Sequence, residues 1–248
     1  MFSQEFIEKI KTAERLTVLT GAGVSAESGI ATFRDPDGLW AQFNPQEMAS
    51  VDGFMSNPDL VWSWYQYRRE TVFKAKPNAG HFAMAEIQDY FDPLTLITQN
   101  VDQLHQRAGS ENVLELHGNI IENHCLDCGE SHDDEIDIQN KEVPVCNFCG
   151  GKIRPSVVWF GEMLPEDVLY QAGAASEDCD LFLTIGTSGE VYPAAGLPMI
   201  AQDYGAYVVE INPNETVYSN RADEKIMLPF SQAMPMIAEI VKKYRTKV

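Results

Sequence analysis

Four cysteines have the spacing of ligands to a single metal ion. They form two C-x2-C pairs, each followed by a glycine: Cys125 with Cys128, and Cys146 with Cys149. A tight turn lets both thiolates of a pair reach one tetrahedral ion, and the distance between the pairs is typical of a zinc ribbon. A site with four sulfur ligands is closed, so we predict a structural zinc and not a catalytic one. The acidic residues between the pairs would repel phosphate, which disfavours a ribbon that binds nucleic acid.

A glycine-rich turn follows the apolar run 16–20 and reads GAGVSAESG over residues 21–29. Glycines between a strand and a helix let backbone N–H groups approach a pyrophosphate. The third glycine comes later than in the G-x-G-x-x-G fingerprint, and no clear acidic residue stands where dehydrogenases bind the ribose. Taken alone, the segment indicates a plain tight turn as readily as a nucleotide site, and it argues against hydride transfer.

Polar residues also follow four other apolar runs, as at the ligand-binding edge of a parallel sheet. They are Gln99, Asn100 and Asp102 after 94–98, His117 after 112–116, Gly186, Thr187 and Ser188 at the end of 180–186, and Asn212 and Asn214 after 206–211. Amide side chains can hold a carboxamide or ribose hydroxyl groups, and a histidine is a candidate general base near pH 7. A lone histidine is more often a capping or core residue. The convergence of these strand ends with the glycine-rich turn nevertheless predicts one ligand cleft.

The elements that would position these residues alternate between strand and helix. Short, nearly uninterrupted apolar runs are typical of parallel strands buried on both faces; they occur at 16–20, 94–98, 112–116, 156–160, 180–186 and 206–211. Helical patterns, such as 165–177 and 231–244, lie between or after them. We therefore predict an α/β fold built on a doubly wound, Rossmann-like parallel sheet.

Two segments interrupt this alternation within what we expect to be one catalytic domain over 1–248. The segment 117–155 carries the cysteines and few apolar residues, and we predict that it is a small inserted zinc-ribbon module. The segment 34–80 is rich in proline and aromatic residues, and we predict a helical lid and cofactor loop there. The Rossmann-like core would then comprise about 1–33, 81–116 and 156–248.

The composition restricts the classes of binding partner and the cellular compartment that we expect for this protein. Asp and Glu total 37 against 18 Lys and Arg, a formal net charge of −19, which disfavours nucleic acid and anionic membranes. The acidity favours lysine-rich partners, but it is explained at least as well by solubility alone. No apolar run has the length of a membrane helix, and the first residues lack the pattern of a signal peptide. The odd number of cysteines, 5, argues against a disulfide framework. We expect a cytoplasmic monomer in which Cys179 is a core residue.

Taken together, these motifs resemble the sirtuin family of NAD-dependent protein lysine deacylases. The matching segments run in family order along nearly the whole chain: 21–40, 98–109, 116–118, the two cysteine pairs, 154–165, 186–195 and 211–215. The resemblance implies that NAD is a consumed co-substrate and that the cysteines hold one structural zinc ion per chain. It also implies NAD-binding roles for Gly21, Ala22, Gly23, Phe33, Arg34, Gln99, Asn100, Asp102, Gly186, Thr187, Ser188, Asn212 and Asn214. Phe230 stands beside the adenine site, where relatives often carry a small residue.

The same resemblance assigns the chemistry to His117. In the family reaction an acyl-lysine carbonyl oxygen displaces nicotinamide from the NAD ribose, and a histidine then accepts a proton from the ribose hydroxyl groups. The products are free lysine, nicotinamide and O-acyl-ADP-ribose. The residues that match the segment pairing with the substrate backbone as an added strand are Val158, Trp159, Phe160, Gly161 and Glu162.

The helical pattern at 61–70 bears on which acyl group is removed. Tyr65 and Arg68 share one face of this helix and match a pair found in the class III sirtuin branch. An arginine can clamp the carboxylate of a succinyl or malonyl group, and a tyrosine hydroxyl adds a donor. Without the resemblance, an ordinary helix with Arg68 and Arg69 in solvent or paired with Glu70 would be the simpler interpretation. With it, we expect succinyl, malonyl and acetyl groups to be removed.

Two other functions stay open on the sequence alone. One is NAD-dependent protein ADP-ribosylation on the same fold, and the other is a non-catalytic NAD-sensing or zinc-ribbon module. The presence of His117 and the complete set of strand-end residues favour an enzyme. Its expected partners are acylated lysine segments of other proteins.

Overall fold

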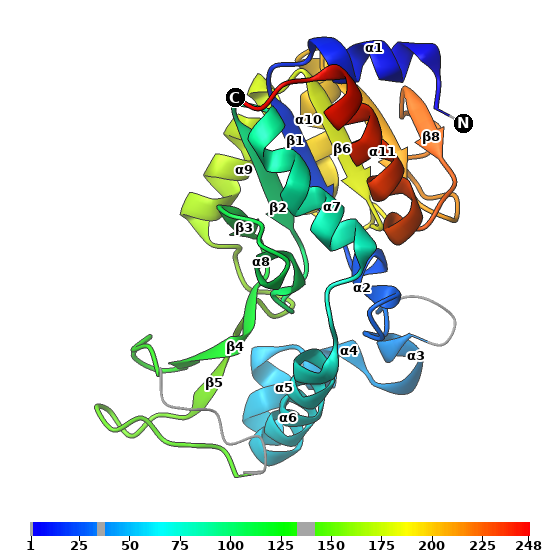
Figure 1. Ribbon diagram of the computed structural model, residues 1–248. Coiled ribbons are helices and arrows are strands. Elements are labelled where there is room, and N and C mark those ends of the chain that lie inside the picture. Colours follow the sequence, from blue (N-terminus) through cyan, green and yellow to red (C-terminus); the bar gives the residue numbers. More distant parts are fainter. Residues whose placement is uncertain (1, 34–37, 133–141) are drawn as a thin grey trace.

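A six-stranded parallel sheet forms the core of the larger of two lobes (Figure 1). The computed structural model describes residues 2–33, 38–132 and 142–248. The strand order is β3–β2–β1–β6–β7–β8, with β1 Leu16–Thr20, β2 Leu94–Thr98, β3 Val113–Glu115, β6 Leu181–Ile185, β7 Tyr207–Ile211 and β8 Glu224–Ile226. The chain winds from β1 outward to β3 and then from β6 outward to β8, so the winding direction changes between β1 and β6. This arrangement confirms the predicted doubly wound sheet.

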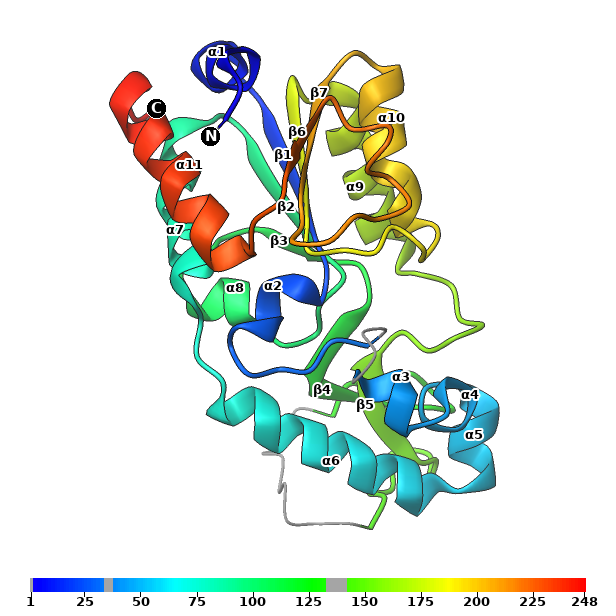
Figure 2. The ribbon, with the colours of Figure 1, turned by 90° about the vertical axis from the view of Figure 1, so that its right-hand side faces the viewer.

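Helices cover both faces of this sheet (Figures 1 and 2). One face packs against α1 Gln4–Thr12, α7 Ala79–Ile87 and α11 Phe230–Tyr244, and the other against α9 Glu166–Asp178 and α10 Leu197–Asp203. Successive strand residues point to opposite faces, so Val18 joins the first core cluster and its neighbour Leu19 the second. Burial on both faces explains why the strands read as continuous apolar runs. Shorter elements of this lobe are α2 Gly23–Ala26, α8 Leu104–Arg107 and the 3-10 turns Gln88–Tyr90 and Ala194–Gly196.

The smaller lobe combines helices with a two-stranded antiparallel sheet. The helices are α3 Leu39–Gln42, α4 Pro45–Met48, α5 Val51–Ser56 and α6 Pro58–Lys74, and the strands are β4 Gly118–Cys125 and β5 Ile153–Val157. Asn57 caps α6 by accepting a hydrogen bond from the amide of Leu60, and Pro58 occupies the first turn, where its missing N–H costs nothing. The buried Arg69 of α6 donates to the carbonyl of Ile120 at 2.7 Å and thereby ties the helix to β4.

The run 156–160 was wrongly predicted to be a strand of the parallel sheet. β5 ends at Val157 and pairs antiparallel with β4, so it crosses the predicted boundary between 155 and 156. Beyond it the amide of Phe160 donates to the carbonyl of Ala49 at 2.8 Å. The apolar side chains of Val157 and Trp159 are buried, but in the aromatic core of the smaller lobe. An apolar run thus indicates burial without identifying the partner against which it packs.

Within the described residues, no helix combines the length and the apolar character needed to cross a membrane.

Candidate active site

A cleft of about 790 Å³ is lined by residues of both lobes. Its walls include the carboxyl ends of β1, β6 and β7, the α6 helix and the segment after β5. The predicted residues that line it are Gly21, Ala22, Gly23, Phe33, Tyr65, Arg68, Gln99, Asn100, His117, Val158, Trp159, Phe160, Gly161, Glu162, Gly186, Thr187, Ser188, Asn212, Asn214 and Phe230. Arg34 lies outside the described residues. Asp102 is buried behind the cleft wall.

Main-chain atoms form the cleft wall between β1 and β6, where the winding direction of the sheet changes. The turns after β1 and β6 meet there, and the amide of Gly23 donates to the carbonyl of Gly186 at 2.8 Å. A Cβ atom on Gly23 would lie 2.8 Å from the Cα of Gly186, and one on Gly21 would lie 2.8 Å from the Cβ of Thr187. Any side chain at these positions would separate the two turns. The surface that results fits a pyrophosphate resting against the main chain.

Asp102 organises this wall from behind. The Ser25 hydroxyl donates to Asp102 Oδ2 at 2.7 Å, and Asn100 Nδ2 donates at 3.1 Å both to Ser25 Oγ and to the carbonyl of Gly21. Burial raises the pKa of the Asp102 carboxyl, while hydrogen bonds from the Leu104 amide and Ser25 oppose that rise. Sequence reasoning missed Ser25; its only signal was a hydroxyl inside the glycine-rich turn.

Polar side chains also link the ends of three strands of the sheet. Gln99, after β2, donates from Nε2 to the hydroxyl of Thr187 at 3.0 Å, and Asn212, after β7, donates from Nδ2 to the carbonyl of Thr187 at 3.2 Å. The amide of Asn214 donates to Asn212 Oδ1 at 3.1 Å. These bonds hold amide and hydroxyl groups along one edge, where they can contact a ribose or a carboxamide.

His117 is held with one ring nitrogen bound to the main chain. Its Nδ1 lies 3.0 Å from the carbonyl oxygen of Gln99, which can only accept, so Nδ1 carries the hydrogen in the neutral ring. The lone pair is then on Nε2, as a general base requires. The next residue, Gly118, has φ +72°, and a Cβ there would lie 2.1 Å from the carbonyl oxygen of Ser156. The glycine therefore allows the turn that presents His117 to the cleft.

Arg68 brings a buried cation to the cleft. It is only 8% exposed, and its guanidinium carbon lies 4.9 Å from the ring centroid of Trp64 and 5.1 Å from that of Phe33. In the described part of the chain it has no hydrogen-bond acceptor and no carboxylate within ion-pair distance. Burial lowers its pKa, although Tyr65 and Asp102 oppose that effect. A buried cation without an anionic partner favours an anionic ligand.

Phe230 closes the cleft where the turn after β1 meets α7. Its ring leaves no room for a side chain on Gly80, since a Cβ there would lie 2.5 Å from a ring carbon. It also contacts two buried histidines edge-on, with ring centroids 5.1 Å from His81 and 6.2 Å from His105. Burial lowers the pKa of His81 to about 4, and burial together with the charge of His81 lowers that of His105 to about 3. Both rings are therefore neutral at physiological pH.

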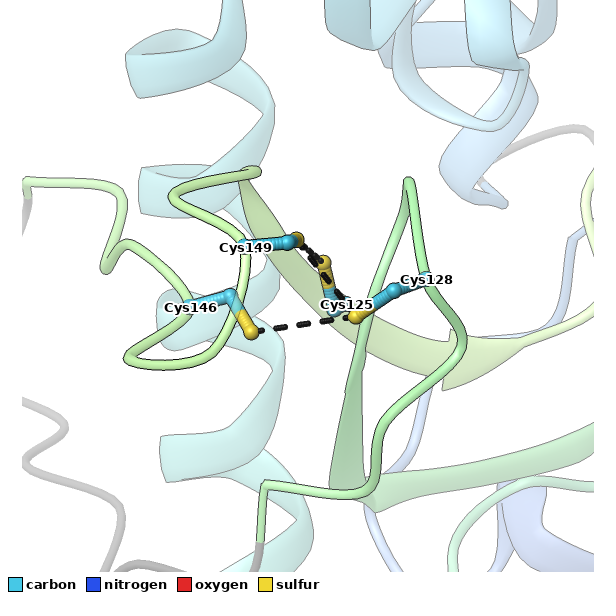
Figure 3. Close-up of side chains that lie close together, drawn as sticks. All are labelled: Cys125, Cys128, Cys146 and Cys149. Carbon is cyan, nitrogen blue, oxygen red and sulfur yellow. Dashed lines mark hydrogen bonds between the residues drawn. The ribbon is translucent and has the colours of Figure 1, made fainter.

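The four predicted metal ligands converge in the smaller lobe, where their side chains point toward one another (Figure 3). Their sulfur atoms all lie within 4.8 Å of one another, with Cys125 and Cys149 at 3.4 Å and Cys128 and Cys146 at 3.8 Å. Tetrahedral zinc with bonds of about 2.3 Å would place sulfurs about 3.8 Å apart, so the geometry fits the ion. Since β4 runs from the residue after His117 to Cys125, the cluster is about 20 Å from the cleft.

The sequence has close counterparts among known proteins. Residues 21–193 match the model of the Sir2 family. An NAD-dependent protein deacylase of Aquifex aeolicus is 46% identical over 233 residues, covering 94% of this chain and 98% of that protein. NAD-dependent protein deacylase 1 of Caldanaerobacter subterraneus is 50% identical over 87% of this chain and 89% of that protein.

Solved structures match both lobes. A mutant Sir2 homologue in complex with ADP-ribose has a TM-score of 0.94 at 44% identity, covering 98% of this chain and 97% of that one. A Sir2 homologue–NAD complex has a TM-score of 0.91 at 44% identity and covers 98% and 95%. A Sir2–p53 peptide–NAD+ complex has a TM-score of 0.86 at 34% identity and covers 96% and 98%.

Proposed function

This chain belongs to the Sir2 family, and we propose that it removes succinyl and malonyl groups, as well as acetyl groups, from lysine side chains of proteins. It is an NAD-dependent protein deacylase, the activity for which relatives matching it over most of their length are named. NAD is its co-substrate, and the four-cysteine cluster fits one structural zinc ion. The acyl preference depends on the residues that line the cleft of this chain.

The single observation that carries the acyl preference is the unpaired cation at Arg68. The guanidinium is buried among aromatic rings, and no carboxylate of the described residues lies within ion-pair distance of it. The carboxylate at the end of a succinyl or malonyl chain would supply that anion in bidentate geometry. Tyr65 lies one turn away on α6, with its ring centroid 5.6 Å from the guanidinium carbon, and its hydroxyl would add a donor. An acetyl group is smaller and uncharged, so it can enter the same space without using this pair.

Other residues of the cleft would bind NAD and the substrate backbone, and one would accept a proton. When bound, NAD supplies an electrophilic ribose carbon and nicotinamide as the leaving group. Gly21 and Gly23 offer main chain for the pyrophosphate, and Gln99 offers its amide to the nicotinamide side of the cleft. His117 Nε2 would accept a proton from a ribose hydroxyl. The segment 158–162, which follows β5 and lines the cleft, would pair with the substrate backbone.

Protein substrates are supported by the p53 peptide in a related complex. The formal net charge of −19 favours lysine-rich segments around the acylated residue and disfavours nucleic acid. We further propose that the protein acts as a cytoplasmic monomer.

A panel of matched peptides tests this proposal. One sequence carrying acetyl-, malonyl- or succinyl-lysine is incubated with the enzyme at saturating NAD, and deacylation is followed by mass spectrometry. We expect NAD-dependent turnover of all three. Turnover of the acetyl peptide alone would refute the acyl assignment. ADP-ribose transferred to protein, with the peptide left acylated, would favour the transferase alternative.

A further inference from the structure

We propose that Trp159 is a positioning residue for acyl selection: its indole N–H occupies the Tyr65 oxygen and so directs the tyrosine hydroxyl hydrogen toward the acyl group. This role is separate from the main-chain pairing predicted for the segment 158–162. It rests on the proposed function, because it needs an acyl carboxylate that accepts the hydrogen.

The contact between the two side chains is short and buried. Trp159 Nε1 lies 2.8 Å from Tyr65 Oη, and the residues are 2% and 0% exposed. An indole N–H can only donate, so the phenol oxygen accepts in this bond. The described residues offer no acceptor for the phenol hydrogen. Burial raises the pKa of Tyr65, outweighing the opposing charge of Arg68, so the hydroxyl keeps its hydrogen at neutral pH.

Three contacts hold the Trp159 indole in place. The backbone amide of Trp159 donates to Glu162 Oε2 at 2.7 Å, and the ring of Phe54 packs against the indole with centroids 5.2 Å apart. The guanidinium of the buried Arg154 lies over its face, 3.4 Å from the ring centroid. Arg154 is itself held by a two-pronged ion pair with Glu162 and by a bond to the carbonyl of Val157 at 2.7 Å.

The position of the cation matters for the donor strength of the indole. Arg154 above the π face draws electron density from the ring, and linked polar contacts polarise one another in a buried site of low dielectric constant. The N–H of Trp159 is therefore a stronger donor to Tyr65 than an isolated indole. By contrast, the N–H of Trp64, which also packs against Tyr65, has no hydrogen-bond partner among the described residues. Of these two indoles, only Trp159 orients the hydroxyl.

The chain of contacts ends at the acyl-reading pair. The Arg68 guanidinium carbon lies 5.6 Å from the Tyr65 ring centroid, and both residues line the cleft. A succinyl or malonyl carboxylate at Arg68 would receive the Tyr65 hydroxyl hydrogen as a further bond. An acetyl group offers no carboxylate oxygen there, so Trp159 should affect the succinyl-to-acetyl ratio more than activity as such.

A double-mutant cycle tests the inference. kcat/KM is measured on succinyl and acetyl peptides for the wild type, W159F, Y65F and the double variant, with thermal melts of each. Losing one oriented hydrogen bond should lower the succinyl-to-acetyl ratio about fivefold in W159F. In the Y65F background, which has no hydroxyl to orient, W159F should leave the ratio unchanged. W62F, on the same helix as Tyr65 but in the core beside the cysteines, controls for loss of an indole and should lower both activities equally or not at all.

Two results would overturn the proposal. One is an equal loss on both peptides in W159F, and the other is the same drop in ratio with and without the Tyr65 hydroxyl. If W159F does not fold, benzothienylalanine at position 159 keeps the ring shape and removes only the N–H, with the same expectations. Failure of the proposed function is recognised separately, because the wild type would then lack turnover of the succinyl peptide.

Discussion

Replacing Arg68 with methionine is expected to reduce deacylation of succinyl-lysine far more than that of acetyl-lysine. Arg68 is 8% exposed and stacks on Trp64 and Phe33, and methionine retains much of its length and apolar contact there. The substitution therefore removes the cation and its hydrogen-bond donors while leaving the aromatic surroundings filled.

The magnitude follows from what the acyl carboxylate would lose. A hydrogen bond to a charged group contributes about 1.5–3 kcal/mol, and each 1.4 kcal/mol corresponds to about tenfold in kcat/KM. Losing one such bond gives a decrease of at least about tenfold for succinyl-lysine, and loss of a bidentate pair gives more. The carboxylate would also stay buried without a partner, which adds to the loss. Arg68→Lys retains the charge without the planar guanidinium, so its kcat/KM for succinyl-lysine should lie between those of the wild type and Arg68→Met.

The assay is a comparison of initial rates on one peptide carrying either acyl group, at saturating NAD. Glu70→Gln is a matched control on the same helix, because Glu70 faces away to pair with Lys74 at 3.4 Å, and it should leave the succinyl-to-acetyl ratio unchanged. The KM for NAD should stay close to that of the wild type in Arg68→Met. Equal losses on the two peptides, or a large rise in the KM for NAD, would refute the reasoning and indicate that Arg68 supports the fold or the NAD site.

Three further predictions concern the metal, the buried histidines and the base. Purified protein should contain one zinc ion per chain by metal analysis, and Cys125→Ser should lose the metal and unfold the smaller lobe; metal-free protein of unchanged stability would contradict this. His81 and His105 have pKa values below the ordinary 6.5, so their neutral forms stabilise the fold above about pH 6.5 and that contribution is lost as the pH falls toward 4. Between pH 7 and pH 5 the free energy of unfolding should fall by about 2 kcal/mol for each ring. Urea titrations of His105→Gln should show a correspondingly smaller fall over this pH range. The same dependence of the free energy of unfolding on pH as in the wild type would contradict this. His117→Ala should lower kcat by about 10²–10⁴-fold with an unchanged circular dichroism spectrum, and wild-type turnover would disprove its role as the base.

Local patterns were sufficient to predict much of this molecule. The apolar run 16–20 is β1, the run 94–98 is β2, and the strands at 181–185 and 207–211 lie within the predicted runs. Strand ends meet at one edge in any parallel sheet, so Gln99 and Thr187 could be assigned to a common cleft before their hydrogen bond was known. The cysteine quartet was equally predictable, because its spacing reflects the coordination geometry of one ion.

Other features depend on contacts that spacing does not encode. The Ser25–Asp102 bond joins residues far apart in the chain, and nothing local to either residue predicts it. The run at 156–160 has the composition of a strand, yet its side chains serve a different core, because burial alone does not specify the partner. The donor relation between Trp159 and Tyr65 likewise arises only when α6 and the segment after β5 are packed together.

The most direct test of the central claim is the product balance of a single reaction. Enzyme, succinyl-lysine peptide and NAD are combined, and nicotinamide, deacylated peptide and O-succinyl-ADP-ribose are quantified together by mass spectrometry. All three should form in equal amounts, and none should form when NAD is omitted. Deacylation without NAD, or nicotinamide release with ADP-ribose attached to protein and the peptide still succinylated, would contradict it.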